Sequence, residues 1–66
     1  MRVYVNGGET EVAEGQTVAA LVTDRGLNPN MVVVEHNMVI LQKEQWPQLT
    51  LTTDDKLEII AFVGGG

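Results

Sequence analysis

The chain opens with the stretch Arg2-Val3-Tyr4-Val5-Asn6-Gly7-Gly8, which predicts how the fold begins. Its first residues are rich in β-formers, with the valines on one face of the strand and Tyr4 on the other. The Asn-Gly-Gly segment supplies the left-handed backbone positions that a tight hairpin turn needs. Residues 9–13 then have the character of a returning strand. The sequence therefore predicts an N-terminal β-hairpin.

A short helix is predicted after this hairpin. Thr17 is a good N-cap residue, and it is followed by Val18, Leu21 and Val22 at helical spacing. Gly26 lies where a C′ glycine would end the helix. A helix of two to three turns with one apolar face is not stable alone, so we expect it to pack on a sheet.

Three further strands complete the predicted fold. They cover residues 31–35, 38–41 and 57–63, with a two-residue turn at His36-Asn37 and one helical turn at 43–46. This order predicts an α+β domain in which one helix packs across a mixed sheet of about five strands. We assign residues 1–63 to the domain and residues 64–66 to a flexible glycine tail.

The last predicted strand has two apolar faces. Leu57, Ile59, Ala61 and Val63 alternate onto the face that the helix should cover. The opposite face presents Glu58, Ile60 and Phe62, and Tyr4 from the first strand is expected to join them. A sheet face in contact with water is normally polar, so this patch is either a second small core or a docking surface. We favour docking, with Tyr4, Ile60 and Phe62 as the docking face, because 66 residues leave little material to cover a second face.

The charge of the chain limits its partners. Its net charge is −5 and it has four Lys and Arg residues in total, which argues against nucleic acid binding. An acidic domain is better suited to a basic protein surface. We expect neither a targeting segment nor a membrane segment, because no apolar run approaches the ~20 residues needed to cross a bilayer. The absence of cysteine is compatible with the reducing cytoplasm.

The usual catalytic groups are missing. The chain has no Cys and no Ser, so serine and cysteine nucleophilic catalysis are excluded. The single histidine, His36, lies in a predicted turn and is expected to be a polar turn residue rather than a metal ligand. Asp54, Asp55 and Glu58 are close in sequence, and we expect surface acids around a turn. The sequence thus predicts a protein that is not an enzyme, with no catalytic residue, no metal and no cofactor of its own.

The glycine tail is the remaining chemical feature. Gly64-Gly65-Gly66 directly follows an apolar strand. Because glycine lacks Cβ, an extended glycine arm can enter a narrow channel, and its backbone can be held by a partner's hydrogen bonds. The Gly66 carboxylate is also unhindered, which suits a group that is activated and then attacked. We predict that Gly66 is the modified residue and that Gly64 and Gly65 thread into the partner's channel. The alternative is a loose chain end without a function.

These features together resemble the ubiquitin-like sulfur carriers of the β-grasp fold, and among them the ThiS family of thiamine biosynthesis. The resemblance covers the whole chain. It rests on Val5-Asn6-Gly7, Gly15-Gln16-Thr17-Val18, Val34-Glu35-His36-Asn37, Glu44-Gln45-Trp46, Asp55-Lys56-Leu57-Glu58-Ile59 and Val63-Gly64-Gly65-Gly66. The chain departs from the family at Thr53-Asp54-Asp55, where relatives tend to have Asp-Gly-Asp. Asp54 must then replace a glycine, and Asp tolerates left-handed geometry better than most residues.

The resemblance implies a carrier cycle. A ThiF-type adenylating enzyme, using ATP and magnesium, would convert the Gly66 carboxylate to an acyl-adenylate. Sulfur from a persulfide donor protein would then displace AMP and leave a thiocarboxylate on Gly66. The thiocarboxylate would give its sulfur to thiazole synthase, ThiG.

Three other readings of the sequence remain open. A sister carrier could serve molybdopterin or cysteine synthesis with the same tail chemistry. A ubiquitin-like protein modifier would end in an isopeptide bond from Gly66 to a lysine. A plain interaction domain would not use its tail at all. The short length and the Glu44-Gln45-Trp46 segment favour the thiamine branch.

Overall fold

The computed structural model describes residues 1–62 of the chain. Secondary structure begins with a hairpin, continues through a helix, and ends with a strand. The elements are β1 (Arg2–Val5), β2 (Gly8–Glu11), α1 (Val18–Asp24), the 3₁₀ turn η1 (Pro29–Met31), β3 (Val32–His36), β4 (Val39–Ile40), the 3₁₀ turn η2 (Lys43–Gln45) and β5 (Lys56–Ala61).

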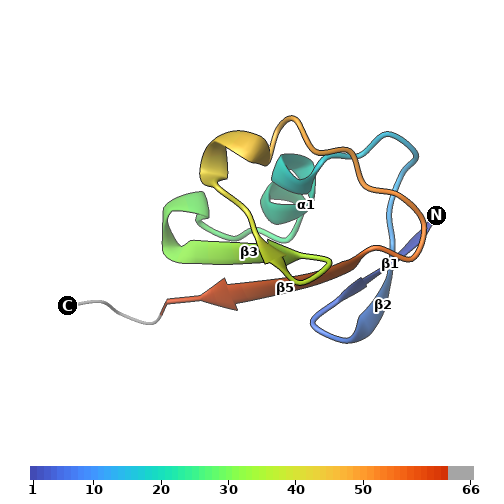
Figure 1. Cartoon of the computed structure of the whole chain (residues 1–66), viewed down its shortest axis with the longest axis horizontal. Helices are drawn as coiled ribbons and strands as arrows, with labels where there is room; N and C mark the ends of the chain where they lie inside the picture. The colour runs from blue at the N-terminus through green and yellow to red at the C-terminus, as the bar shows by residue number, and fades with distance from the viewer. Residues whose placement is uncertain (63–66) are drawn as a thin grey trace.

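The strands form one five-stranded sheet in the order β2-β1-β5-β3-β4. The chain's first and last strands, β1 and β5, are parallel neighbours, whereas the other pairs are antiparallel. α1 lies across one side of the sheet (Figure 1). The predicted α+β fold, a mixed sheet of about five strands with one helix packed across it, is confirmed.

Both ends of the helix follow the sequence signals. The Thr17 hydroxyl accepts a hydrogen bond of 3.2 Å from the Ala20 N–H, which is the expected N-cap contact. Gly26 has a φ of 71°, and the Leu27 N–H donates to the Val22 carbonyl over 3.3 Å. Left-handed geometry at the residue after the C-cap ends the helix, as predicted.

The second hairpin turn differs from its prediction by one residue. Positive φ angles occur at Asn37 (47°) and Met38 (74°), so these two residues form the turn, and not His36-Asn37. His36 is instead the last residue of β3 and pairs with Leu57 and Val39. Long-range pairing to β5 sets this register, and the local sequence does not contain it.

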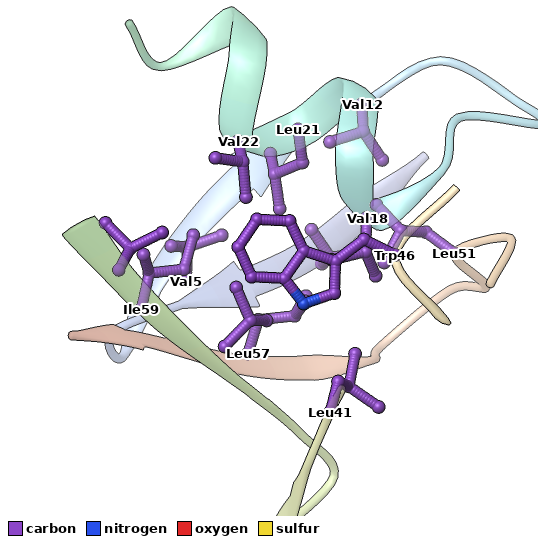
Figure 2. Packing of buried hydrophobic residues seen from close by; sticks show 13 residues of the cluster. Val5, Val12, Val18, Leu21, Val22, Leu41, Trp46, Leu51, Leu57 and Ile59 are labelled. Carbon is purple, nitrogen blue, oxygen red and sulfur yellow. The ribbon is translucent and has the colours of Figure 1, made fainter. Parts of the chain in front are cut away.

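The core lies between α1 and the sheet (Figure 2). Trp46 is 4% exposed, and its ring lies between the helix residues Leu21 and Val22 and the strand residue Leu57. Nine further apolar side chains complete the buried cluster: Val3, Val5, Val12, Val18, Val32, Val34, Leu41, Leu51 and Ile59. The opening strand therefore buries both of its valines, as predicted.

The prediction that Ala61 lies under the helix is wrong, because Ala61 is exposed. α1 has seven residues and is about 10 Å long, whereas β5 has six residues and spans about 20 Å. The helix therefore covers Leu57 and Ile59 but not the end of the strand. Val63, which was predicted on the same face, lies outside the described residues.

Candidate functional site

The residue predicted to be modified, Gly66, and the residues predicted to thread into a partner, Gly64 and Gly65, lie outside the described residues. The structure does describe the strand that leads to them. β5 lies between β1 and β3 in the sheet and runs away from the N-terminal end of the molecule (Figure 1). The last described residue, Phe62, donates its N–H to the Met31 carbonyl over 2.8 Å. The sheet therefore holds the chain up to four residues before its end.

Two of the three predicted docking residues come together. Ile60 and Phe62 are each 54% exposed, at the C-terminal end of β5. Ile60 is paired with Val33 of β3, which extends the apolar surface by one half-buried side chain. Because large apolar side chains are exposed beside the chain's end, this surface has the composition of a contact site.

Tyr4 does not join these two residues. It shares their side of the sheet, but it is paired with Lys56, four residues before Ile60 on β5. Four strand residues span about 13 Å, so Tyr4 is separated from the exposed pair. Tyr4 instead lines a hollow of about 280 Å³ with Gly7, Lys56, Leu57 and Glu58. The Arg2 guanidinium carbon lies 5.6 Å from the centre of the Tyr4 ring, within cation–π range.

Three exposed apolar residues were not singled out in the sequence analysis. Met38 is 88% exposed, and Val39 and Ile40 are each 62% exposed. They follow one another through the turn into β4, which is the edge strand of the sheet. Met38 to Leu41 form a continuous apolar run, which is typical of a buried strand, and the edge position of β4 explains the exposure.

Asp55 was predicted to be a surface acid, and this prediction is wrong. The residue is 6% exposed, and its side chain is hydrogen-bonded to the β3–β4 hairpin. Oδ2 accepts from the Thr52 N–H over 2.8 Å and lies 3.0 Å from His36 Nε2. Oδ1 accepts from the Thr52 hydroxyl over 3.0 Å and from Asn37 Nδ2 over 3.1 Å. The carboxylate therefore joins the loop before β5 to the neighbouring hairpin.

The environment of Asp55 lowers the pKa of its carboxyl group. Burial alone raises the pKa, because it disfavours the charged form. The hydrogen bonds from the Thr52 backbone, His36, Asn37 and the Thr52 hydroxyl together outweigh burial, so the pKa lies below its usual value. His36 is thus a polar partner of a carboxylate, and the described residues contain no group of three potential metal ligands.

Asn6 is a second residue whose role the sequence analysis missed. It was predicted only as a turn residue, and its φ of 50° is compatible with that role. Its side-chain amide also bonds the backbone of Ile59, 53 residues away. The sequence around Asn6 does not predict a contact with a residue so far along the chain. Asp54, in contrast, has a φ of 69°, the left-handed geometry inferred for it from sequence.

Comparison with known proteins identifies similar chains. A model of the ThiS family matches residues 2–66. A crystal structure of the thiamine biosynthesis protein ThiS from Geobacter metallireducens superposes with a TM-score of 0.85 at 32% identity, covering 100% of both chains. The sulfur carrier protein ThiS of Bacillus subtilis is 38% identical over 50 residues, which are 76% of each protein.

Longer proteins also contain a region similar to this chain. A thiazole synthase of Paramagnetospirillum magneticum is 39% identical over all 66 residues, and one of Magnetococcus marinus is 30% identical. The chain spans 20% of the length of each of these two proteins. Within residues 1–62, no helix combines the length and apolar character required to cross a membrane.

Proposed function

The chain belongs to the ThiS family, and we propose that it is a sulfur carrier of thiamine biosynthesis that carries sulfur on the carboxylate of Gly66. One observation supports this function above the others. The family match extends from residue 2 to residue 66 and so includes both the β-grasp body and the three terminal glycines. The full-length likeness to the Geobacter ThiS structure supports the same assignment.

The proposed reaction begins on a ThiF-type adenylating enzyme. A carboxylate oxygen of Gly66 attacks the α-phosphorus of ATP, the bond to the β-phosphate breaks, and pyrophosphate leaves with its electron pair. The product is an acyl-adenylate. Magnesium and basic groups of that enzyme stabilise the charge that develops on the phosphates. The chain itself contributes the carboxylate and the surface by which it is held.

Sulfur enters in the second step. The terminal sulfur of a persulfide on a donor protein attacks the acyl carbon and displaces AMP, which leaves an acyl disulfide between Gly66 and the donor. A thiolate outside this chain then attacks the donor-side sulfur, forms a disulfide with it, and releases the thiocarboxylate on Gly66. The sulfur comes from outside because this chain has no cysteine. Thiazole synthase then receives the sulfur. The similarity of this chain to one fifth of two thiazole synthases supports that partner, since a region like this chain occurs there within a protein named thiazole synthase.

The short distance between body and carboxylate limits where the partner can bind. Gly66 lies four residues beyond Phe62, and this segment spans at most about 14 Å. The enzyme surface that contacts the end of β5 must therefore lie close to its bound ATP. Ile60 and Phe62 are exposed at this end of the strand, so we propose them as the docking contacts. Tyr4 is too distant to contribute to the same small contact.

The experiment that tests this function measures intact mass. The chain is incubated with ATP, magnesium, a ThiF-type enzyme and a sulfur source, and we expect the mass to rise by the exchange of one oxygen for sulfur. Adducts on lysines of other proteins would instead indicate a protein modifier. A known ThiS protein, incubated with the same enzyme in parallel, serves as the positive control. If that protein gains sulfur and the mass of this chain stays unchanged, the proposal is contradicted.

Deletion of Gly65 and Gly66 is expected to abolish thiocarboxylate formation, because no carboxylate then reaches the ATP. Neither glycine has a side chain that could add to a hydrophobic core, so the melting temperature should stay unchanged. Thermal unfolding monitored by circular dichroism checks the fold, and mass spectrometry checks the chemistry. Activity that survives the deletion would show that the tail is idle.

The identity of the sulfur recipient is a separate question. The nearest alternatives are carriers for molybdopterin or cysteine synthesis, which share the tail chemistry. A pull-down that compares thiazole synthase with the large subunit of molybdopterin synthase separates them. We expect capture of thiazole synthase, and capture of the molybdopterin protein alone would contradict this assignment.

A further inference from the structure

Asn6 lies where β1 turns away from β5. Its φ of 50°, together with 81° at Gly7, provides the two left-handed positions of a tight hairpin turn. The Asn6 backbone N–H still donates to the Leu57 carbonyl over 2.8 Å, as a strand residue would. No later residue of β1 is available to pair with β5, since the chain has already reversed into β2.

The side-chain amide of Asn6 replaces that missing strand residue. Its Oδ1 accepts from the Ile59 N–H over 2.7 Å, and its Nδ2 donates to the Ile59 carbonyl over 3.2 Å. A primary amide offers the same donor and acceptor types as a peptide unit, so the parallel pairing continues by one step. Within residues 1–62, these are the hydrogen bonds from the first hairpin that lie closest to the C-terminal end of β5.

For the described residues beyond Ile59, which end at Phe62, the backbone pairing is with β3 and the residue before it. Ile60 and Ala61 pair with Val33 and Val32, and the Phe62 N–H donates to the Met31 carbonyl. The direction in which the chain leaves the sheet therefore depends on the hydrogen bonds on the two sides of β5. The Asn6 amide is the anchor on the β1 side, and β3 with Met31 forms the anchor on the other.

We propose that Asn6 is a positioning residue for the chemistry at Gly66. Its amide holds the end of β5 at the angle from which the last residues reach the adenylating enzyme. This inference rests on the proposed function. Gly66 lies four residues beyond Phe62, at most about 14 Å, so a tilt of roughly 10° at the end of the strand moves an extended end by about 2 Å. A misplacement of about 1 Å can reduce a reaction rate by roughly a hundredfold.

Asn37 offers a matched control within the same chain. It is also an asparagine with left-handed φ, 47°, in a two-residue hairpin turn. Its Oδ1 also accepts from a backbone N–H of β5, that of Lys56, over 2.9 Å. The difference is position, since Lys56 begins β5 and Ile59 lies three residues nearer the tail. Replacing each asparagine with glycine keeps the turn geometry and removes the amide.

Kinetics of adenylation provide the first test. The assay follows ATP–pyrophosphate exchange by a ThiF-type enzyme with the whole chain as substrate. We expect Asn6→Gly to lower kcat by roughly tenfold or more, with KM for the chain within about twofold of the unmodified value. Asn37→Gly should leave kcat within about twofold, although both variants lose side-chain hydrogen bonds and should show lowered melting temperatures.

Amide hydrogen exchange provides a readout that is independent of activity. In Asn6→Gly, exchange of the Ile59 N–H should accelerate by roughly tenfold relative to the core amides, because its acceptor is gone. In Asn37→Gly, the Lys56 N–H should respond and the Ile59 N–H should not. Asn6→Asp keeps an oxygen for the Ile59 N–H but loses the donor to the Ile59 carbonyl. It should therefore lie between Asn6→Gly and the unmodified chain in both assays.

The outcomes separate this inference from the proposed function. If the unmodified chain is adenylated and the two glycine variants have the same kcat, Asn6 is only a structural residue and the inference is wrong. An effect confined to KM would also contradict it, because it would indicate docking rather than positioning. If the unmodified chain is not adenylated at all, the proposed function fails and the positioning role fails with it. Unchanged exchange at Ile59 in Asn6→Gly would show that the amide does not hold β5.

Discussion

At the scale of single residues, Asp55 shows how one buried carboxylate joins distant parts of the chain. It lies directly before β5 and bonds His36 and Asn37 of the β3–β4 hairpin as well as Thr52 of its own loop. Each of these hydrogen bonds favours the ionised form of the carboxylate. Removing the charge while the donors stay in place leaves buried donors without a full acceptor, which is costly.

The lowered pKa of Asp55 leads to a prediction for stability against pH. Near its ordinary pKa of 3.8, Asp55 binds a proton more readily in the unfolded chain than in the folded chain. The free energy of unfolding gained from this group is therefore fully present above that pH and is lost as the pH falls through the lower folded-state value.

We expect Asp55→Asn to remove about 1–3 kcal/mol of stability at neutral pH. The variant should also show a shallower loss of stability on acidification, because its amide does not titrate in this range. Urea unfolding at a series of pH values measures both effects. Parallel pH profiles of the variant and the unmodified chain would contradict this account of Asp55.

At the scale of elements, the pairing of β3 with β5 places two like charges opposite one another. Glu35 and Glu58 are direct cross-strand partners on the side of the sheet away from the helix. Neither forms an ion pair within the described residues 1–62. Like charges directly opposite each other in a sheet are destabilising. The Glu35–Glu58 pair lies next to the Val33–Ile60 pair on the same side of the sheet, beside the proposed contact surface.

Glu58→Gln is accordingly expected to stabilise the fold by about 0.2–1 kcal/mol at low salt, with a smaller gain at high salt, because ions screen the repulsion. Glu9→Gln is the matched control. Glu9 is an exposed strand glutamate whose cross-strand partner is Tyr4, and the substitution changes net charge equally. Urea unfolding of both variants at two salt concentrations measures the difference. Equal effects of the two substitutions would mean that net charge, and not the pairing, is responsible.

At the scale of the whole molecule, the fold separates stability from contact. One side of the sheet carries α1 and the core, and the end of β5 carries exposed apolar residues close to the tail (Figure 1). The net charge of −5 favours approach to a basic partner surface and raises the rate of encounter. The exposed Ile60 and Phe62 would then provide the short-range contact.

Phe62→Asp is expected to weaken binding to the adenylating enzyme by roughly tenfold or more, because it removes a large apolar contact. The fold should persist, since Phe62 is 54% exposed. Met38→Asp is the control, because this substitution adds the same charge at a residue that is 88% exposed. Met38 lies in the turn beside the start of β5, away from Phe62. Isothermal titration calorimetry measures both affinities. Equal weakening by the two variants would attribute the effect to charge and reject the docking surface.

Much of the fold could be predicted from sequence because its signals act over a few residues. The turn at Asn6-Gly7, the cap at Thr17 and the end of the helix at Gly26 each depend on the φ angle or side chain of one residue. The alternation of apolar residues in β1 and β5 also placed Val3, Val5, Leu57 and Ile59 on the face of the sheet that is buried.

The sequence by itself therefore determined the fold class, the ends of the helix, the buried faces of the first and last strands, and the family to which the chain belongs. Only the tertiary structure decided the register of the second hairpin, the burial of Asp55, the separation of Tyr4 from Ile60 and the contact of Asn6 with Ile59. The physical reason is sequence separation. These features depend on β5 pairing with β1 and β3 across tens of residues, and that register is set by packing of the whole sheet.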